Sequence, residues 1–192
     1  MTIRLLRIVT IWSFCILTAA IILAATTRAN QPPGAGGGYV LQPDEGEVLF
    51  LGNPPGKVII KVASDKTGSP QMAMGIQWVD VAIPVHLHEH EEEFLFVHRG
   101  QGVGILGDQR VPVQAGTTIY IPPGTWHGVE NTGPEASQIM WVVTPGTGKT
   151  TRLEHFFREA GSPAGAEPKS FTLERLIDLL KKHDMRVPPP PK

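Results

Sequence analysis

Histidine and glutamate side chains with the spacing of metal ligands lie near the middle of this 192-residue chain. The first cluster reads His86-x-His88, followed after four residues by Glu93 and after six more by Gly100. Side chains two positions apart in a strand point to the same face, so we expect the two imidazoles side by side. Glu93 opens a second apolar strand, and Gly100 ends that strand where a tight turn is needed.

A second cluster contains one more histidine and ends at Asn131. Five residues separate Gly116 from Pro122-x-Gly124, two more precede His127, and a further three precede Asn131. The β-branched and aromatic residues between Gly116 and Pro122 predict a short strand. The Pro-Pro-Gly sequence predicts a turn, after which His127 begins the next strand.

Together the two clusters offer three imidazoles and one carboxylate, which suit a divalent first-row metal ion. Four protein ligands leave two positions open on a six-coordinate ion. An open position is typical of a catalytic site, because structural sites are closed.

The two clusters resemble both motifs of the cupin family, over roughly residues 70–145. The family's first motif has a Gly six residues before its first His, where this chain has Asp80, a residue that tolerates left-handed turns. The resemblance implies one divalent metal, with Fe expected first and Mn, Ni, Cu or Zn as alternatives. It places the metal ligands at four residues: His86, His88, Glu93 and His127.

The turn between the first two strands carries other residues of ligand type. Glu92 would replace Glu93 if the turn were one residue shorter, but the six-residue count to Gly100 favours Glu93. His98 lies an odd number of residues from Glu93, so we expect its side chain to face away from the metal. Three further residues are expected in a solvated turn: Glu89, His90 and Glu91.

The composition is that of an ordinary globular chain, with 41% hydrophobic and 18% charged residues and a formal net charge of −1. The first 29 residues contain three arginines and no acid, so the remainder has 14 basic and 18 acidic side chains. A mildly acidic chain without a basic stripe is not expected to bind nucleic acid. The single cysteine, Cys15, excludes an intrachain disulfide.

Residues 1–29 resemble an export signal. Arg4 and Arg7 precede the uncharged, mostly apolar run 8–25, and small residues follow it. The run is long for the apolar region of a cleaved signal and of borderline length for a membrane span. Either reading places the domain outside the cytoplasm, in the periplasm, secreted, or anchored to the inner membrane. Residues 30–39, rich in Gly and Pro, are interpreted as a flexible linker.

Residues 40–145 predict a series of short strands separated by Gly, Pro and Asp, which indicates an all-β domain. The resemblance implies a double-stranded β-helix, that is, a jelly-roll barrel. Residues 146–192 predict a helical extension with a proline-rich end. Its helices, over 151–160 and 171–183, have apolar stripes at helical spacing and are expected to pack on the outside of the barrel. The order of this tail also resembles the small quercetin-dioxygenase-like cupins.

Residues 145–150 read Pro-Gly-Thr-Gly-Lys-Thr, like the end of a phosphate-binding loop. That motif requires a Gly five residues before Gly148, where this chain has Val143. We therefore interpret this segment as a plain loop.

An inward Glu93 implies an inward Leu95 and Val97, because side chains alternate along a strand. The other expected pocket residues are aromatic or flexible: Trp78, Tyr120, Trp126 and Met140. Such a pocket suits a small organic molecule beside the metal.

The expected function is that of a metal-dependent oxygenase, with Glu93 as ligand or as catalytic base. A non-catalytic binding or sensing protein is the alternative, and an isomerase or lyase is the third hypothesis. Members of the family also pair edge strands into homodimers, but nothing in the sequence sets the oligomeric state.

Overall fold

The computed structural model describes residues 38–52, 54–68 and 71–189. The chain separates into two compact units, residues 1–41 and 42–192, and the described strands and helices belong to the second. The expected export segment 1–29 and the linker as far as residue 37 lie outside the described residues. Within the described ranges, no helix is both long and apolar enough to cross a bilayer.

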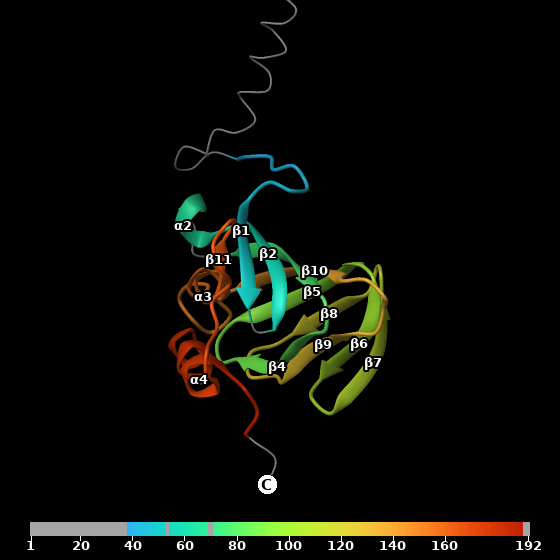
Figure 1. The fold of residues 1–192 in the computed structure, drawn as a ribbon. Coiled ribbons are helices and arrows are strands. Elements are labelled where there is room, and N and C mark those ends of the chain that lie inside the picture. Colours follow the sequence, from blue (N-terminus) through green and yellow to red (C-terminus); the bar gives the residue numbers. More distant parts are fainter. Residues whose placement is uncertain (1–37, 53, 69–70, 190–192) are drawn as a thin grey trace, which may run out of the picture. The chain divides into compact units, whose positions relative to one another are not determined.

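Two sheets make up the domain (Figure 1). The larger sheet has the strand order β11-β1-β2-β3-β10-β5-β8, and the smaller one the order β12-β4-β9-β6-β7. The strands of the larger sheet are β1 (Glu47–Gly52), β2 (Pro55–Val62), β3 (Ala73–Val79), β5 (Glu92–Arg99), β8 (Thr118–Ile121), β10 (Ser137–Thr144) and β11 (Ser162–Pro163). Those of the smaller sheet are β4 (Ala82–His88), β6 (Gln101–Leu106), β7 (Gln109–Gln114), β9 (His127–Asn131) and β12 (Met185–Arg186).

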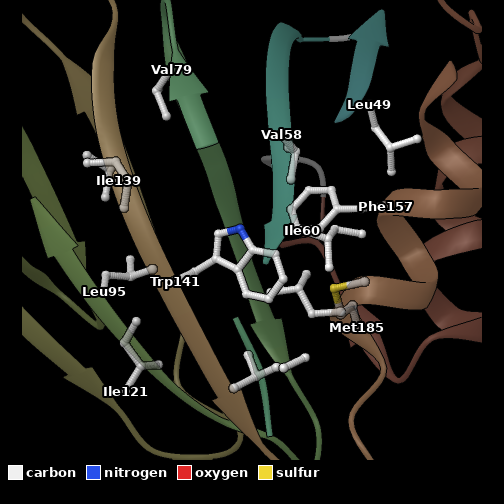
Figure 2. Packing of buried hydrophobic residues seen from close by; sticks show 14 of the residues in the cluster. Leu49, Val58, Ile60, Val79, Leu95, Ile121, Ile139, Trp141, Phe157 and Met185 are labelled. Carbon is white, nitrogen blue, oxygen red and sulfur yellow. The ribbon is translucent and has the colours of Figure 1, made fainter. Parts of the chain in front are cut away.

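The sheets face each other across an apolar core, as alternation along the strands requires. In β10 the buried positions include Ile139, Trp141 and Val143, and the residues between them are less buried. Trp141 packs against Phe157, with ring centroids 5.4 Å apart (Figure 2). All-antiparallel pairing and two packed sheets make this an all-β jelly roll with short C-terminal helices, as predicted.

Glycine at position 75 of β3 makes room for the Trp141 ring. A Cβ atom at Gly75 would lie 2.4 Å from the ring of Trp141, closer than atoms in real structures approach. A residue without a side chain is therefore needed where β3 passes beneath the indole.

Within the described residues, three helices accompany the sheets: α2 (Ser64–Thr67), α3 (Leu153–Ala160) and α4 (Leu173–Lys182). Both predicted C-terminal helices are present, at nearly the expected residues. The short strands that follow each of them were not predicted. Strand β11 pairs with β1, and β12 pairs with β4, where Met185 lies opposite His88. The C-terminal extension therefore adds an edge strand to each sheet.

Candidate metal centre

The four predicted ligands come from three strands and meet between the two sheets. Strand β4 carries His86 and His88, and its pairing with β9 places His127 opposite His86. Glu93 arrives from the other sheet, on β5, where it pairs with Val143 and Ile121. The ligand atoms of the four residues all lie within 4.8 Å of one another. A single ion with ligand bonds of about 2.0–2.2 Å requires donors grouped on this scale.

The three imidazole rings form a compact group. The ring centroid of His86 lies 4.3 Å from that of His127 and 5.1 Å from that of His88. His88 and His127 are fully buried, whereas His86 is partly exposed. His86 and Glu93 both line the adjoining cavity, so the centre can be reached from that side.

The Nδ1 atom of each ring faces an acceptor oxygen. In His86 it lies 2.8 Å from the carbonyl oxygen of Pro84, and in His127 it lies 2.9 Å from that of Thr125. A carbonyl cannot donate, so Nδ1 of both rings carries the hydrogen. In the neutral rings, Nε2 is therefore a bare lone pair, which is the form that binds a metal.

The side chains turn these acceptor atoms toward one another. Nε2 of His127 lies 2.8 Å from Oε2 of Glu93, and Nε2 of His88 lies 3.6 Å from the same oxygen. Among the described residues, none of these three atoms has a hydrogen-bond partner. Buried acceptors this close repel each other unless they share a cation, which is either an added ring proton or a metal ion. The donor set therefore fits a divalent metal.

Burial and neighbouring charges set the protonation of the group. Burial, followed by the charges of His127 and His88, lowers the pKa of His86 to about 3. Burial would raise the pKa of Glu93, but the close His127 and the charge of His88 outweigh burial and lower it to about 2. His86 is thus neutral and Glu93 ionised near pH 7, and both are ready to act as ligands.

For His88, burial disfavours the charged ring, but Glu91 and Glu93 outweigh burial and raise the pKa. Nδ1 of His88 lies 2.9 Å from Oε2 of Glu91. The sequence placed Glu91 in a solvated turn, and this is wrong: its side chain is 2% exposed. Each oxygen of this carboxylate has a partner within the protein, and the partner amides lie 61 and 62 residues further along the chain. No local sequence pattern reveals such partners.

The other residues of the turn lie largely where they were expected. His90 is exposed, and the partly buried Glu89 pairs with Arg186. Glu92 accepts hydrogen bonds from Tyr120 and Thr144 and is absent from the ligand group. His98 is exposed and faces away, as predicted. Glu89 and His90 also form a more exposed ligand-type group with Asp184, whose carboxylate is already paired with Arg152.

An apolar cavity of about 130 Å³ adjoins His86 and Glu93. Barrel residues form one side of its wall, among them Gln77, Leu95 and Trp141. The C-terminal extension forms the other side, with Phe156, Phe157, Leu176, Leu180, Met185 and Val187. The two helices pack against the barrel, as expected. Their apolar stripes also complete the wall of the cavity, which was not predicted.

Of the six pocket residues expected from the sequence, Leu95 belongs to the described wall and Val97 is buried in the core. Trp78 and Met140 are absent from the wall because β3 and β10 turn their neighbours Gln77 and Trp141 inward. Tyr120 is 56% exposed. Trp126, which is partly buried, is also absent from the described lining. The sequence predicts that side chains alternate along each strand, but the structure decides which face of the strand lines the cavity.

The model of the family described as the cupin domain matches residues 77–143. The matched segment runs from β3 to β10 and contains all four ligands. The match supports the cupin superfamily. Comparison with curated proteins gives no significant sequence match.

Solved structures resemble this domain. A predicted oxalate decarboxylase from Thermotoga maritima is 20% identical and has a TM-score of 0.50, and the match covers 55% of this chain and 98% of that one. An RmlC-like cupin from Shewanella frigidimarina is 17% identical with a TM-score of 0.48, over 57% and 92% of the two chains. At 20% identity, the likeness to the Thermotoga maritima structure supports the fold alone.

A sugar phosphate isomerase from Silicibacter pomeroyi is 19% identical with a TM-score of 0.41. The match covers 46% of this chain and 59% of that one, so this chain spans less than two thirds of that protein. The activities named for these neighbours differ from one another, and each belongs to its own protein.

Proposed function

We propose that this cupin binds one divalent metal and acts as a metal-dependent oxygenase on a small, largely apolar organic molecule. The observation that carries the proposal is the continuity of the ligand group with the apolar cavity, to which both His86 and Glu93 contribute. An apolar cavity with a few converging polar groups is the usual form of a small-molecule site.

The chain's own residues would hold the reactants and exclude water. His88 and His127 are the buried ligands, and the partly exposed His86 lies at the border of the cavity. The amide of Gln77, also in the wall, is placed to orient a polar group of the substrate. A bound redox-active metal such as Fe(II) would supply Lewis acidity and electrons for chemistry with O₂.

Glu93 has two roles in this proposal, as anionic ligand and as acceptor of a proton from a substrate hydroxyl. With its pKa lowered to about 2 it is ionised throughout the physiological range, which favours the ligand role. As a base it would be weak, so proton transfer requires a substrate group made acidic at the centre.

The experiment measures bound metal per chain in the full-length protein, in the double variant His86→Ala/His88→Ala and in the exposed-histidine control His98→Ala. We expect about one metal per chain in the protein and in the control, and none in the double variant. O₂ consumption is then screened with phenolic and diketone substrates. Metal retained by the double variant, or turnover that survives metal removal, would contradict the proposal.

A second function, non-catalytic ligand binding or sensing, is favoured by the scarcity of ionisable groups in the cavity wall. Apart from the ligands His86 and Glu93, Lys169 is the charged residue of the described lining. Binding without turnover predicts that a ligand is recovered unchanged after aerobic incubation. The same apolar wall disfavours an isomerase or lyase acting on a polar sugar, which needs hydrogen-bonding groups around the substrate.

The quercetin-dioxygenase-like subtype and the extracytoplasmic location are parts of this proposal. The basic and apolar segment 1–29 supports export, with cleavage or anchoring as the two outcomes. Cell fractionation followed by mass measurement of the N-terminus would distinguish the two.

A further inference from the structure

The three histidine ligands are oriented in two different ways. Main-chain carbonyls, those of Pro84 and Thr125, accept from Nδ1 of His86 and His127. For His88, the acceptor is a side chain, that of Glu91, at 2.9 Å. Among the described residues, His88 is therefore the ligand whose tautomer a single substitution elsewhere can change.

The second oxygen of Glu91 is occupied by the start of helix α3. Oε1 accepts from the backbone amide of Arg152 at 2.6 Å and from that of Leu153 at 3.3 Å. The side chain of Arg152, the N-cap residue, makes no capping hydrogen bond. Glu91 thus satisfies two amides that a helix leaves without partners inside its first turn.

The start of α3 is also part of the cavity wall. Leu153 and Phe157 line the cavity, and both belong to the buried core. One carboxylate therefore bridges a metal ligand on one side and the wall of the cavity on the other. The whole bridge is enclosed, since the side chains of His88 and Glu91 are each 2% exposed.

A carboxylate suits this place because both of its oxygens accept. The amide of a glutamine has one oxygen and one NH₂ group, and NH₂ only donates. If the amide oxygen in the variant Glu91→Gln faced α3, the NH₂ group would face Nδ1 of His88 and move the ring hydrogen to Nε2. If the amide oxygen faced His88, the NH₂ group would oppose the two helix amides. Either arrangement breaks one half of the bridge.

We propose that Glu91 is a positioning residue that holds His88 in the metal-binding tautomer and couples metal binding to the first turn of α3. The proposal rests on the metal centre of the proposed function and is independent of oxygen chemistry. Because coupling is reciprocal, metal binding tightens the helix start, and the docked helix start favours metal binding.

The first test measures Zn²⁺ affinity, by competition with a chelator, for the full-length protein, Glu91→Gln and the matched control Glu92→Gln. Zn²⁺ is redox-inactive, so the result does not depend on turnover. Loss of a residue that orients a histidine ligand typically weakens metal binding about 10–100-fold, and we expect this for Glu91→Gln. Glu92 is the next residue along the chain but accepts hydrogen bonds from Tyr120 and Thr144 outside the centre, so its variant should stay within about threefold of the unchanged protein.

The second test uses the unchanged protein, so it does not depend on how well a variant folds. Nitrogen-15 NMR of the Zn²⁺-loaded protein should show hydrogen on Nδ1 of His88. Hydrogen exchange of the Arg152 and Leu153 amides should slow on adding Zn²⁺. The Arg175 amide, which Thr172 caps at the start of α4, is the internal control and should not change.

The outcomes separate the two proposals. An unchanged protein that binds no Zn²⁺ would overturn both the metal centre and the coupling. Normal Zn²⁺ binding together with wild-type affinity in Glu91→Gln would overturn the positioning role and leave the metal centre standing. Unchanged exchange at Arg152 and Leu153 would overturn the coupling to the helix.

Discussion

At the scale of single residues, the centre is defined by where each ligand keeps its hydrogen. His86 and His127 donate from Nδ1 to carbonyls of their own neighbourhood, two residues away in each case. Contacts between residues this close in the sequence form together with the local backbone conformation. The lone pairs of Nε2 therefore converge before any metal arrives, and Glu93 meets them from the opposite sheet.

Replacing Glu93 with Gln should weaken Zn²⁺ binding by at least about 100-fold, because an anionic ligand becomes a neutral one in a buried site. Calorimetric titration of the metal-free protein provides the measurement. Glu92→Gln is the matched control, since Glu92 bonds to hydroxyl groups outside the centre, and it should bind within about threefold of the unchanged protein. Zn²⁺ binding that is weakened in Glu92→Gln but not in Glu93→Gln would show that Glu92 is the ligand.

At the scale of elements, helix α3 is held at both ends. Glu91 satisfies its first amides, and Arg158 in its last turn reaches Glu47 of β1. Nε of Arg158 lies 3.0 Å and Nη2 2.9 Å from Oε2 of Glu47, and Nη1 lies 3.1 Å from Asp65. The second anchor connects α3 to the opposite end of the large sheet from β8, independently of the metal ligands.

The ion pair of Glu47 should make stability depend on pH. Burial would raise the pKa of Glu47, but hydrogen bonds from Arg158 and Lys66 outweigh it and hold the pKa below the ordinary value of 4.5. The folded state therefore binds its proton less readily than the unfolded chain, so the stabilisation is complete above pH 4.5. It is lost as the pH falls from there through the lower, folded-state pKa.

Urea unfolding of the metal-free protein and of Glu47→Gln tests this expectation. The variant should be less stable by about 1 kcal/mol at pH 7, and the difference should shrink as the pH falls below 4.5. The exposed Glu135, 3.9 Å from Arg99, supplies the control variant Glu135→Gln, which should change stability by less than about 0.5 kcal/mol at either pH. A difference for Glu47→Gln that does not vary with pH would contradict the assignment.

At the scale of the whole domain, side chains of the C-terminal extension share one buried core with the barrel. Phe157, Leu180 and Met185 belong to the same apolar cluster as Trp141, and Figure 2 shows Phe157 and Met185 near the indole. Strand β12 also extends the small sheet beside His88. Stability of the barrel and closure of the cavity therefore both depend on residues beyond the segment matched by the family model.

Two leucines of α4 provide a direct comparison. Leu180 is 7% exposed and lines the cavity, whereas Leu173 is 72% exposed. Leu180→Ala should lower the free energy of unfolding by about 3 kcal/mol, through lost burial and the void left behind. Leu173→Ala should change it by less than about 0.5 kcal/mol. Chemical denaturation measures both, and equal effects would show that the helix does not pack as described.

Much of the centre could be predicted from spacing because its parts are local. His86 and His88 share a face through strand alternation, and the count from Glu93 to Gly100 marks one strand. The turn Pro122-Pro123-Gly124 places His127 at the start of β9. Each of these signals lies within a few residues of the feature that it predicts.

The pocket was predicted less well because its wall depends on contacts between distant segments. In β3 the larger apolar side chains, Met74, Ile76 and Trp78, share one face, but the opposite face, which carries Gln77, is the buried one. That outcome depends on the position of β3 between β2 and β10, where Gly75 lies opposite Trp141. Glu91 looked like a turn residue because its helix amides lie far along the chain. The tail's part in the cavity wall was not predicted, because the cavity exists only after the barrel has formed.

The sequence by itself determined the all-β character, the two C-terminal helices and the four residues whose ligand atoms meet. The reason is that strand parity, turn residues and helical periodicity are properties of short segments. Tertiary structure decided which strand faces are buried, what completes the cavity wall and which carboxylate orients His88. These depend on register between strands and on partners that lie far away in the sequence, such as Met185 opposite His88, and no short pattern carries that information.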